Sequence, residues 1–372
     1  MSKKIRVLHI IKSLGRGGAE MLLPETLKLH DSQRFEFHYV YFLPWKNQMV
    51  SAIENNNGVV HCFKASNNIQ IMLEANKIAN YVVEHKINII HCHLPWAGFL
   101  GRLVHQKTNI PLVYTEHNMQ ERYHWVTKFL NRVSFNSQSL AIGVSEDVSS
   151  SILKNIKPKI PVVTLLNGVN TKKYKKKNLV GLHEELNIPS DAFVVGVVAV
   201  FRFQKRLKEW MQVFKKFSDK NPNVCGIIIG DGPLKKELIA ERKALNLEDK
   251  ILMPGLQTET RPYFEIMDVF MMTSSFEGLP IALLEAMSME CAIVSTDAGG
   301  IKEVLEDGKN GLMVTVNNWE DLVEKLEILM KSEEEKTRLQ KAARLRVLEK
   351  FSMESMVKKL ELNYLKLLEN GN

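Results

Sequence analysis

Short apolar runs of strand length alternate with stretches of helical spacing along the whole 372-residue chain. This alternation is typical of parallel α/β structure, in which each strand is followed by a helix that crosses back over the sheet. The runs are continuous, as expected for strands that helices cover on both faces. We predict strands at Ile5–Ile11, Phe37–Phe42, Val59–Phe63, Ile87–His91, Leu112–Thr115, Leu140–Val144, Val162–Leu166, Val194–Phe201, Val224–Ile229, Ile251–Met253, Val269–Thr273, Ala292–Thr296 and Gly311–Val314.

The basic segment 171–177 (TKKYKKK) separates two series of strands, and we interpret it as a solvated linker between two similar α/β halves. A length of 372 residues agrees with two domains. Hydrophobic residues make up 45% and charged residues 25%, which excludes a disordered, collagen-like or coiled-coil architecture. The 4 Cys are scattered without a C-x-x-C pair, so the sequence favours a reducing compartment over a disulfide framework or a zinc ribbon.

No apolar run reaches the roughly 18–20 residues that a membrane span needs, and the N-terminus lacks the pattern of a signal peptide. We therefore expect a cytoplasmic protein. The net charge of +8 lies entirely in residues 1–170, which hold 19 Lys+Arg against 11 Asp+Glu, whereas the remainder holds 31 of each. This charge either serves solubility or attracts the first half to an anionic surface or substrate. Nucleic acid is disfavoured, because the basic residues carry no motif of a nucleic-acid-binding fold.

Glycine follows a predicted strand and precedes a predicted helix in three loops, Gly15–Glu20, Gly230–Pro233 and Glu277–Pro280. Glycine permits close backbone approach, and the free amides at a helix N-terminus favour an anion such as a phosphate. None of the three is a Rossmann G-x-G-x-x-G or a Walker motif, which disfavours a dehydrogenase or an ATPase. Three such loops together indicate a ligand that carries phosphate.

The segment 274–287 (SSFEGLPIALLEAM) offers two carboxylates near one of these loops. Glu277 lies at the entrance of a predicted helix, and Glu285 lies just over one turn inside it. A carboxylate can accept hydrogen bonds from the neighbouring hydroxyls of a ribose or a hexose. The alternative is that Glu277 only complements the helix dipole and Glu285 is a surface residue, although apolar neighbours surround Glu285.

This segment, with the following Ala298–Val304 and Asp307–Leu312, resembles the donor-binding half of the retaining GT-B glycosyltransferases of family 4 (glycosyl transferases group 1). The resemblance extends over nearly the whole chain. Further matches are GGAE at Gly17–Glu20, His117 after a strand, Val144-Ser145-Glu146, Asn167–Asn170, FRFQKR at Phe201–Arg206, and Phe351-Ser352 before a final helix.

The resemblance implies two Rossmann-like domains that face each other across a cleft. Residues 1–170 would form the acceptor-side domain, residues 171–351 the nucleotide-sugar-binding domain, and residues 352–372 a helix that packs back on the first domain. The implied reaction is retaining transfer of a hexose-type sugar from a nucleotide diphosphate sugar, of UDP or GDP type, to a saccharide or lipid-linked acceptor. Surface polysaccharide assembly is the expected setting.

By resemblance, Arg202 and Lys205 hold the donor diphosphate, where two cations would stabilise the negative charge of the departing group. Arg206 is a further candidate, because the spacing between Arg202 and Lys205 is shorter than is common in the family. Glu277 would approach the transferred sugar, and Glu285 would hold the ribose.

The resemblance also implies contacts from the backbone and from the first half. The backbone at Gly278 and Leu279 would meet sugar or phosphate oxygens, and Leu256 would lie near the nucleobase. The amides of Gly17 and Gly18 would close over the diphosphate, and His117 would contact the donor sugar. We count Glu277, His117, Arg202 and Lys205 as the catalytic candidates.

No obligatory metal is expected. His91 and His93 flank Cys92, but no further Cys/His pair has complementary spacing. An Asp-x-Asp motif, which holds a metal–diphosphate complex in the other major glycosyltransferase fold, does not occur in the sequence. The resemblance leaves two mechanisms open: attack by the acceptor on the face that the diphosphate leaves, or double displacement through Glu277.

The segment Arg122–Arg132 mixes aromatic and basic residues on a predicted helix. It is either a packed helix with a basic outer face or a peripheral contact with anionic membrane near a lipid-linked acceptor. Two other functions remain open for the chain as a whole. One is a non-catalytic nucleotide-sugar-binding subunit, and the other is a GT-B epimerase or phosphorylase.

Overall fold

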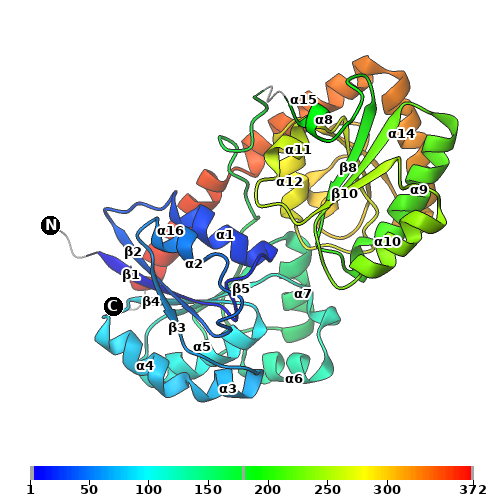
Figure 1. Cartoon of the computed structure of the whole chain (residues 1–372). Coiled ribbons are helices and arrows are strands. Elements are labelled where there is room, and N and C mark those ends of the chain that lie inside the picture. Colours follow the sequence, from blue (N-terminus) through cyan, green and yellow to red (C-terminus); the bar gives the residue numbers. More distant parts are fainter. Residues whose placement is uncertain (1–3, 178–180, 370–372) are drawn as a thin grey trace. The chain divides into compact units, whose positions relative to one another are not determined.

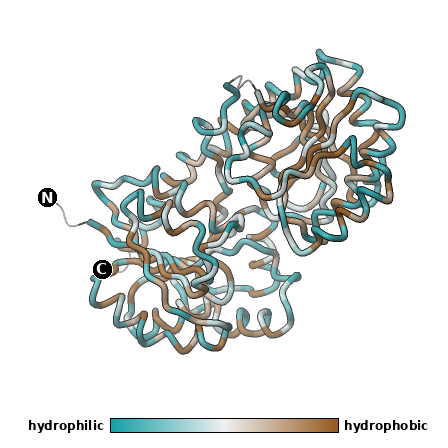
Figure 2. Tube along the Cα trace, in the orientation of Figure 1, coloured by the Kyte–Doolittle hydropathy of each residue, from teal (hydrophilic) through white to brown (hydrophobic). Residues whose placement is uncertain are grey.

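The computed structural model describes residues 4–177 and 181–369, and the chain divides into two compact units. Residues up to Asn167 and those from Met353 onward form the first unit, and Gly168–Ser352 form the second. Each unit contains one parallel sheet with helices on both faces (Figure 1). The trace is hydrophobic along the strands and hydrophilic on the outer helices (Figure 2). The α/β fold that the alternating pattern predicts is therefore confirmed.

The first unit has a seven-stranded sheet in the order β3-β2-β1-β4-β5-β6-β7. Its strands are β1 (Ile5–Ile10), β2 (Phe35–Tyr41), β3 (Val59–Cys62), β4 (Ile89–His93), β5 (Leu112–Glu116), β6 (Leu140–Gly143) and β7 (Val162–Thr164). Its helices are α1 (Gly18–Leu27), α2 (Val50–Glu54), α3 (Asn68–Leu73), α4 (Ala75–Glu84), α5 (Pro95–Thr108), the 3-10 turn η1 (Gln120–Arg122), α6 (Trp125–Ser134), α7 (Glu146–Ile156) and α16 (Met353–Glu369).

Strand β4 shows how the two faces of this sheet differ. Ile90 and Cys92 point into an apolar core that also contains Leu100 of α5 and Ile152 of α7. His91 points to the other face, where its Nδ1 lies 2.6 Å from the hydroxyl of Tyr364 on α16. The last helix of the chain is thereby fixed to the first sheet.

The second unit has a six-stranded sheet in the order β10-β9-β8-β11-β12-β13. Its strands are β8 (Phe193–Val198), β9 (Val224–Ile229), β10 (Ile251–Gly255), β11 (Val269–Met272), β12 (Ala292–Thr296) and β13 (Leu312–Val314). Its helices are α8 (Leu182–Glu185), η2 (Phe203–Lys205), α9 (Leu207–Lys220), α10 (Lys235–Ala244), α11 (Arg261–Ile266), α12 (Ile281–Ser288), α13 (Ile301–Val304), η3 (Val316–Asp321), α14 (Leu322–Lys331) and α15 (Glu333–Lys350).

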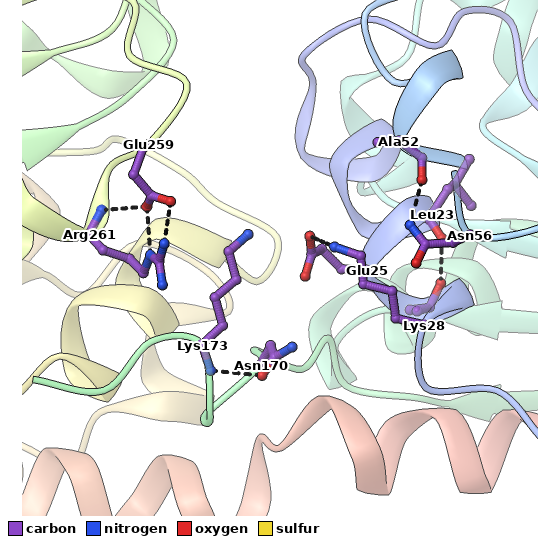
Figure 3. Close-up of polar contacts among 10 residues, drawn as sticks. Leu23, Glu25, Lys28, Ala52, Asn56, Asn170, Lys173, Glu259 and Arg261 are labelled. Atoms are coloured by element: carbon purple, nitrogen blue, oxygen red, sulfur yellow. Dashed lines mark hydrogen bonds and ion pairs between the residues drawn. The ribbon is translucent and has the colours of Figure 1, made fainter. Parts of the chain in front are cut away.

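The structure corrects the interpretation of segment 171–177 as a solvated linker. Asn170 Oδ1 accepts a hydrogen bond of 3.0 Å from the Lys173 amide, which folds the chain into a turn (Figure 3). Tyr174 is then buried, and its carbonyl accepts hydrogen bonds from Ser288 Oγ at 2.6 Å and from Arg344 at 2.7 Å. Local composition misses these partners because both lie far along the chain.

The predicted strand at Ile87–His91 lies two residues further along, at Ile89–His93. Polar histidines at its end hide its true extent, since all five of its residues are buried. None of the helices in residues 4–177 and 181–369 has the length and apolar character of a membrane span.

Candidate active site

The second sheet has a switch point between β8 and β11. The first strand of this unit, β8, lies in the middle of the sheet. Strands β9 and β10 follow on one side of it, and β11, β12 and β13 follow on the other. In open parallel sheets ligands bind beyond the carboxyl ends of the strands at such a point, because the two flanking loops diverge there. The residues after β8 include Arg202–Arg206, and those after β11 include Ser274–Pro280.

At this switch point Lys205 and Glu277 form an ion pair. Lys205 Nζ lies 2.6 Å from Glu277 Oε1, and Ser274 Oγ donates to the same oxygen at 2.6 Å. The two side chains are 19% and 10% exposed, so both retain some access to solvent. An ammonium group and a carboxylate thus lie together at the place where the topology favours a ligand.

Hydrogen bonds between the two loops hold this pair in place. Thr273 Oγ1 donates to the carbonyls of Lys205 at 3.0 Å and of Arg206 at 2.8 Å. The Ser275 amide donates to the Gln204 carbonyl at 2.8 Å. These contacts hold the loop after β8 against the end of β11, so the backbone segments that carry Lys205 and Glu277 stay next to each other.

The other two basic candidates differ in their surroundings. Arg202 is exposed. Arg206 has a left-handed backbone with φ of 49°, and its guanidinium donates to the Val316 carbonyl at 2.9 Å and lies 3.8 Å from Glu209. The structure therefore brings Lys205 to Glu277, but it directs Arg206 to other partners.

Two glycines allow a close approach to the Glu277 loop. Gly299 has a left-handed φ of 55°, and a Cβ at this position would overlap the Glu277 carbonyl oxygen. A Cβ on Gly300 would overlap the Gly278 carbonyl oxygen. No side chain fits at either position unless the loop that carries Glu277, Gly278 and Leu279 moves.

Glu285 is buried on α12, and its neighbour is Tyr174. Burial raises the pKa of Tyr174, and the Glu285 carboxylate raises it further. Nearby, the Arg261 guanidinium forms two hydrogen bonds with Glu259, of 2.7 and 2.6 Å (Figure 3). Sequence reasoning missed Tyr174, although it is the only aromatic residue in TKKYKKK.

The last candidate of the second unit, Leu256, follows β10 and is 53% exposed. Gly255, just before it, has a φ of 79° and accepts a hydrogen bond of 3.0 Å from the Gly230 amide. Leu256 therefore lies at the same edge of the sheet as Lys205, two strands away from β8.

A cavity of about 570 Å³ lies beside β13. It is lined by Asp297, Lys302, Leu305, Asp307, Met313, Val314, Thr315, Asn318, Asp321, Glu324 and Lys325. None of the predicted site residues lines it.

The first sheet has its own switch point between β1 and β4. Gly17 is the N-cap of α1 and Gly18 is its first residue, so their amides lie at a helix N-terminus just after β1. His117 follows β5, the strand next to β4. Burial lowers the pKa of His117 from an ordinary 6.5 to about 4, so this imidazole is neutral at pH 7.

Three further histidines gather under α1 and α16. Ring nitrogens of His9, His91 and His93 lie within 4.8 Å of one another, and this group could hold a metal ion. His9 comes from β1 and lies opposite His91 in the pairing of β1 with β4, which sequence spacing does not reveal. Spacing along the sequence therefore connects only His91 and His93.

The hydrogen bonds of these rings favour a structural role for the cluster. His9 Nδ1 and His93 Nε2 lie 2.9 Å apart and bond to each other. His91 bonds to Tyr364 through Nδ1 and to Thr115 Oγ1 through Nε2 at 2.7 Å. A metal ion would have to displace some of these bonds.

Two doubly wound parallel sheets in tandem match the two-domain GT-B fold. The chain belongs to the family 4, group 1 glycosyltransferases. The model described as Glycosyltransferase Family 4 matches residues 16–173, and the model described as Glycosyl transferases group 1 matches residues 182–346. The predicted family, GT-B fold and enzyme class are thereby confirmed.

Relatives agree with this family, and a solved structure agrees with the fold. The alpha-monoglucosyldiacylglycerol synthase of Acholeplasma laidlawii is 27% identical over 333 residues, which span 83% of each chain. The N-acetylgalactosamine-N,N'-diacetylbacillosaminyl-diphospho-undecaprenol 4-alpha-N-acetylgalactosaminyltransferase of Campylobacter jejuni is 27% identical over 344 residues, 87% of this chain and 89% of that one. The crystal structure of Anabaena HepE in complex with UDP and glucose superposes with a TM-score of 0.87 at 19% identity, covering 97% of this chain and 100% of HepE.

Proposed function

We propose that this enzyme transfers a hexose-type sugar from a nucleoside diphosphate donor to a saccharide or lipid-linked saccharide, with retention at the anomeric carbon and without an obligatory metal. The observation that carries the proposal is the Lys205–Glu277 pair, 2.6 Å apart at the switch point of the second sheet. A cation and a carboxylate in one place suit a ligand that joins an anionic diphosphate to a sugar rich in hydroxyls.

The chemistry assigns a task to each of these groups. When the bond between the anomeric carbon and the diphosphate oxygen breaks, the electron pair moves to the diphosphate. Lys205, together with the exposed Arg202, would stabilise that charge, because electrostatic groups fixed in advance act most strongly where charge develops. When the donor binds, Lys205 would contact a phosphate oxygen in place of Glu277. The Glu277 carboxylate would then be free to contact the sugar.

The remaining candidates would bind the rest of the donor. Glu285, beside Tyr174, would accept hydrogen bonds from the ribose, and the backbone at Gly278 and Leu279 would meet sugar or phosphate oxygens. Leu256 would lie near the nucleobase, and Arg206 would contribute only by leaving the Val316 carbonyl.

From the first unit, the amides of Gly17 and Gly18 would approach the diphosphate, since a helix N-terminus favours an anion. Because its pKa is about 4, His117 would meet the donor sugar as a neutral hydrogen-bonding group.

Two routes to retention fit these groups. In the first, the acceptor hydroxyl attacks on the face that the diphosphate leaves, and its proton passes to the leaving phosphate. In the second, the Glu277 carboxylate forms an ester with the anomeric carbon, and the acceptor then displaces it. Trapping a sugar on Glu277 with a slow acceptor would distinguish the second route from the first.

The relatives support the substrate classes. The Acholeplasma enzyme is named for a glucosylated diacylglycerol and the Campylobacter enzyme for a diphospho-undecaprenol saccharide, and HepE holds UDP and glucose. We therefore favour a UDP-sugar donor, with GDP-sugars as the second choice, and a lipid-linked acceptor in surface polysaccharide assembly. Lipid-linked acceptors would place the enzyme at the cytoplasmic face of a membrane.

Helix α6 supports a peripheral contact with that membrane. Trp125, Phe129 and Val133 recur every four residues and are 71%, 59% and 62% exposed, which forms an apolar stripe along one side of the helix. Lys128 and Arg132 are exposed beside the stripe. Apolar and basic side chains in this arrangement suit the boundary between acyl chains and anionic headgroups.

Sedimentation with vesicles tests the membrane contact. The wild-type protein should pellet with anionic phosphatidylglycerol vesicles at low salt and be released at high salt. The variant Trp125→Ser/Phe129→Ser should stay in the supernatant. Equal binding of this variant and the wild type would refute the contact, as would wild-type indifference to anionic lipid.

Donor hydrolysis tests the proposed function itself. Incubation with a panel of UDP-, GDP- and ADP-sugars and a broad set of acceptors should release nucleoside diphosphate from one donor, and Glu277→Ala should abolish the release. Binding without release would favour the non-catalytic subunit. Turnover that requires inorganic phosphate would instead indicate a phosphorylase, and conversion of one nucleotide sugar into its epimer would indicate an epimerase.

A further inference from the structure

A fully buried carboxylate, Glu116, ends strand β5 directly before His117. Its side chain is 0% exposed, although charged side chains are seldom fully buried in proteins. Burying an ionised carboxylate is unfavourable unless hydrogen bonds replace the lost water, so its partners should be numerous.

Five donors surround this carboxylate. Oε1 accepts from the amides of His117 at 2.9 Å and Asn118 at 3.2 Å, and from the Tyr123 hydroxyl at 2.5 Å. Oε2 accepts from the Tyr114 hydroxyl at 2.7 Å and from Gln120 Nε2 at 2.8 Å. Burial raises the pKa of Glu116, and the hydrogen bonds from the two tyrosine hydroxyls and the two backbone amides oppose that rise because they stabilise the carboxylate form.

The network continues through two amides to a buried cation. Gln120 Oε1 accepts from Asn131 Nδ2 at 3.1 Å, and Asn131 Oδ1 accepts from Arg102 at 3.1 Å. Arg102 is 1% exposed, and its guanidinium also donates to Gln138 at 2.9 Å. The network therefore joins the carboxyl group at the end of β5 to a buried guanidinium.

The imidazole of His117, in contrast, has no such support. Within residues 4–177 and 181–369 no hydrogen bond involves its ring, and its buried Nε2 has no partner. The ring of His93 is its aromatic neighbour, with centroids 5.8 Å apart. The place of the imidazole thus depends on where its backbone is held, and Glu116 holds that backbone.

We propose that Glu116 is a positioning residue for the glycosyl transfer, which fixes His117 by accepting the His117 and Asn118 amides on one carboxylate oxygen. The inference rests on the proposed function, because it assumes that His117 contacts the donor sugar. Glu116 itself is too deeply buried to touch substrate. A displacement of about 1 Å in a group that contacts the reacting sugar can slow a reaction by about 100-fold.

The test is a double-mutant cycle with Glu116→Gln and His117→Ala. We expect Glu116→Gln to lower kcat by about 10- to 100-fold with a much smaller change in the donor KM. If Glu116 acts through His117, the double variant should be no slower than His117→Ala alone. The matched control is Tyr114→Phe, which removes a donor from Oε2 without touching the loop backbone and should keep kcat within about 3-fold of the wild type.

Several results would overturn the inference. One is a wild-type kcat for Glu116→Gln when His117→Ala is slow. Another is a double variant whose loss of rate equals the product of the two single losses. A wild-type rate for His117→Ala would remove the assumed contact with the sugar, and the positioning role with it.

Hydrogen exchange keeps the inference testable apart from turnover, for instance if no donor is hydrolysed and the proposed function fails. The amides of His117 and Asn118 should exchange at least about 10-fold faster in Glu116→Gln than in Tyr114→Phe. Equal exchange in the two variants would refute the hold on the loop.

Discussion

Acid should weaken the folded enzyme through histidines that the fold keeps neutral, and His117 is one of them. Its pKa is about 4 in the folded chain, against an ordinary value of 6.5. Between these two values the unfolded chain binds a proton that the folded chain does not, so stability falls as the pH falls through this window. Well above pH 6.5 both states are neutral and the effect disappears.

The size of the effect follows from the two pKa values. From pH 7 to pH 5, His117 should remove about 2 kcal/mol from the free energy of unfolding, as an upper value for a partly exposed ring. The variant His117→Asn removes this titration without breaking a hydrogen bond of the ring among the described residues. The wild type should therefore lose about 2 kcal/mol more than the variant over this range.

Urea unfolding at pH 7, 6 and 5 measures this difference. Tryptophan fluorescence follows the transition, and the comparison of wild type with variant cancels the titration of groups that do not interact with His117, whereas His91 and His93 do interact with it. The difference should develop mainly between pH 6.5 and 5, where the unfolded chain binds slightly less than one proton more than the folded chain. Parallel loss of stability in the two proteins would refute the lowered pKa of His117.

Two further substitutions test the geometry of the second unit. Gly300→Ala should displace the loop that carries Glu277 and lower donor turnover by about 10-fold or more. Equal turnover of Gly300→Ala and wild type would contradict the close packing. Tyr174→Phe removes the hydroxyl beside Glu285 and should raise the donor KM several-fold, by about 1 kcal/mol of binding, with kcat retained; an unchanged KM would separate Tyr174 from donor binding.

Most of the fold could be predicted from the sequence because buried parallel strands are continuous apolar runs. The prediction is wrong at β4, where two buried histidines carry the strand past His91 to His93. It is also wrong at segment 171–177, because Tyr174 is buried and its carbonyl accepts a hydrogen bond from Arg344, 170 positions further along the chain. The composition of a short segment contains no information about a partner as distant in sequence as Arg344.

The sequence indicates the candidate residues one by one, but it does not indicate which of them lie in contact. Motif resemblance and strand ends indicate Lys205 and Glu277 separately, whereas their contact depends on β8 lying next to β11, which only the sheet order provides. The same holds for His9, which meets His91 through the register of β1 with β4. Glu116 was missed because a single carboxylate after a strand carries no signal until its five donors are known.

Binding of nucleoside diphosphate to Lys205→Met tests the central claim most directly. Calorimetric titration with UDP or GDP, whichever the wild type binds, should show about 10- to 100-fold weaker affinity for this variant, as expected from losing one charge-assisted hydrogen bond. Affinity for the nucleoside without phosphates should stay unchanged, and Lys208→Met, which alters an exposed ion pair with Glu237, should bind as the wild type does. Equal diphosphate affinity of Lys205→Met and the wild type would contradict a donor site at the β8–β11 switch point.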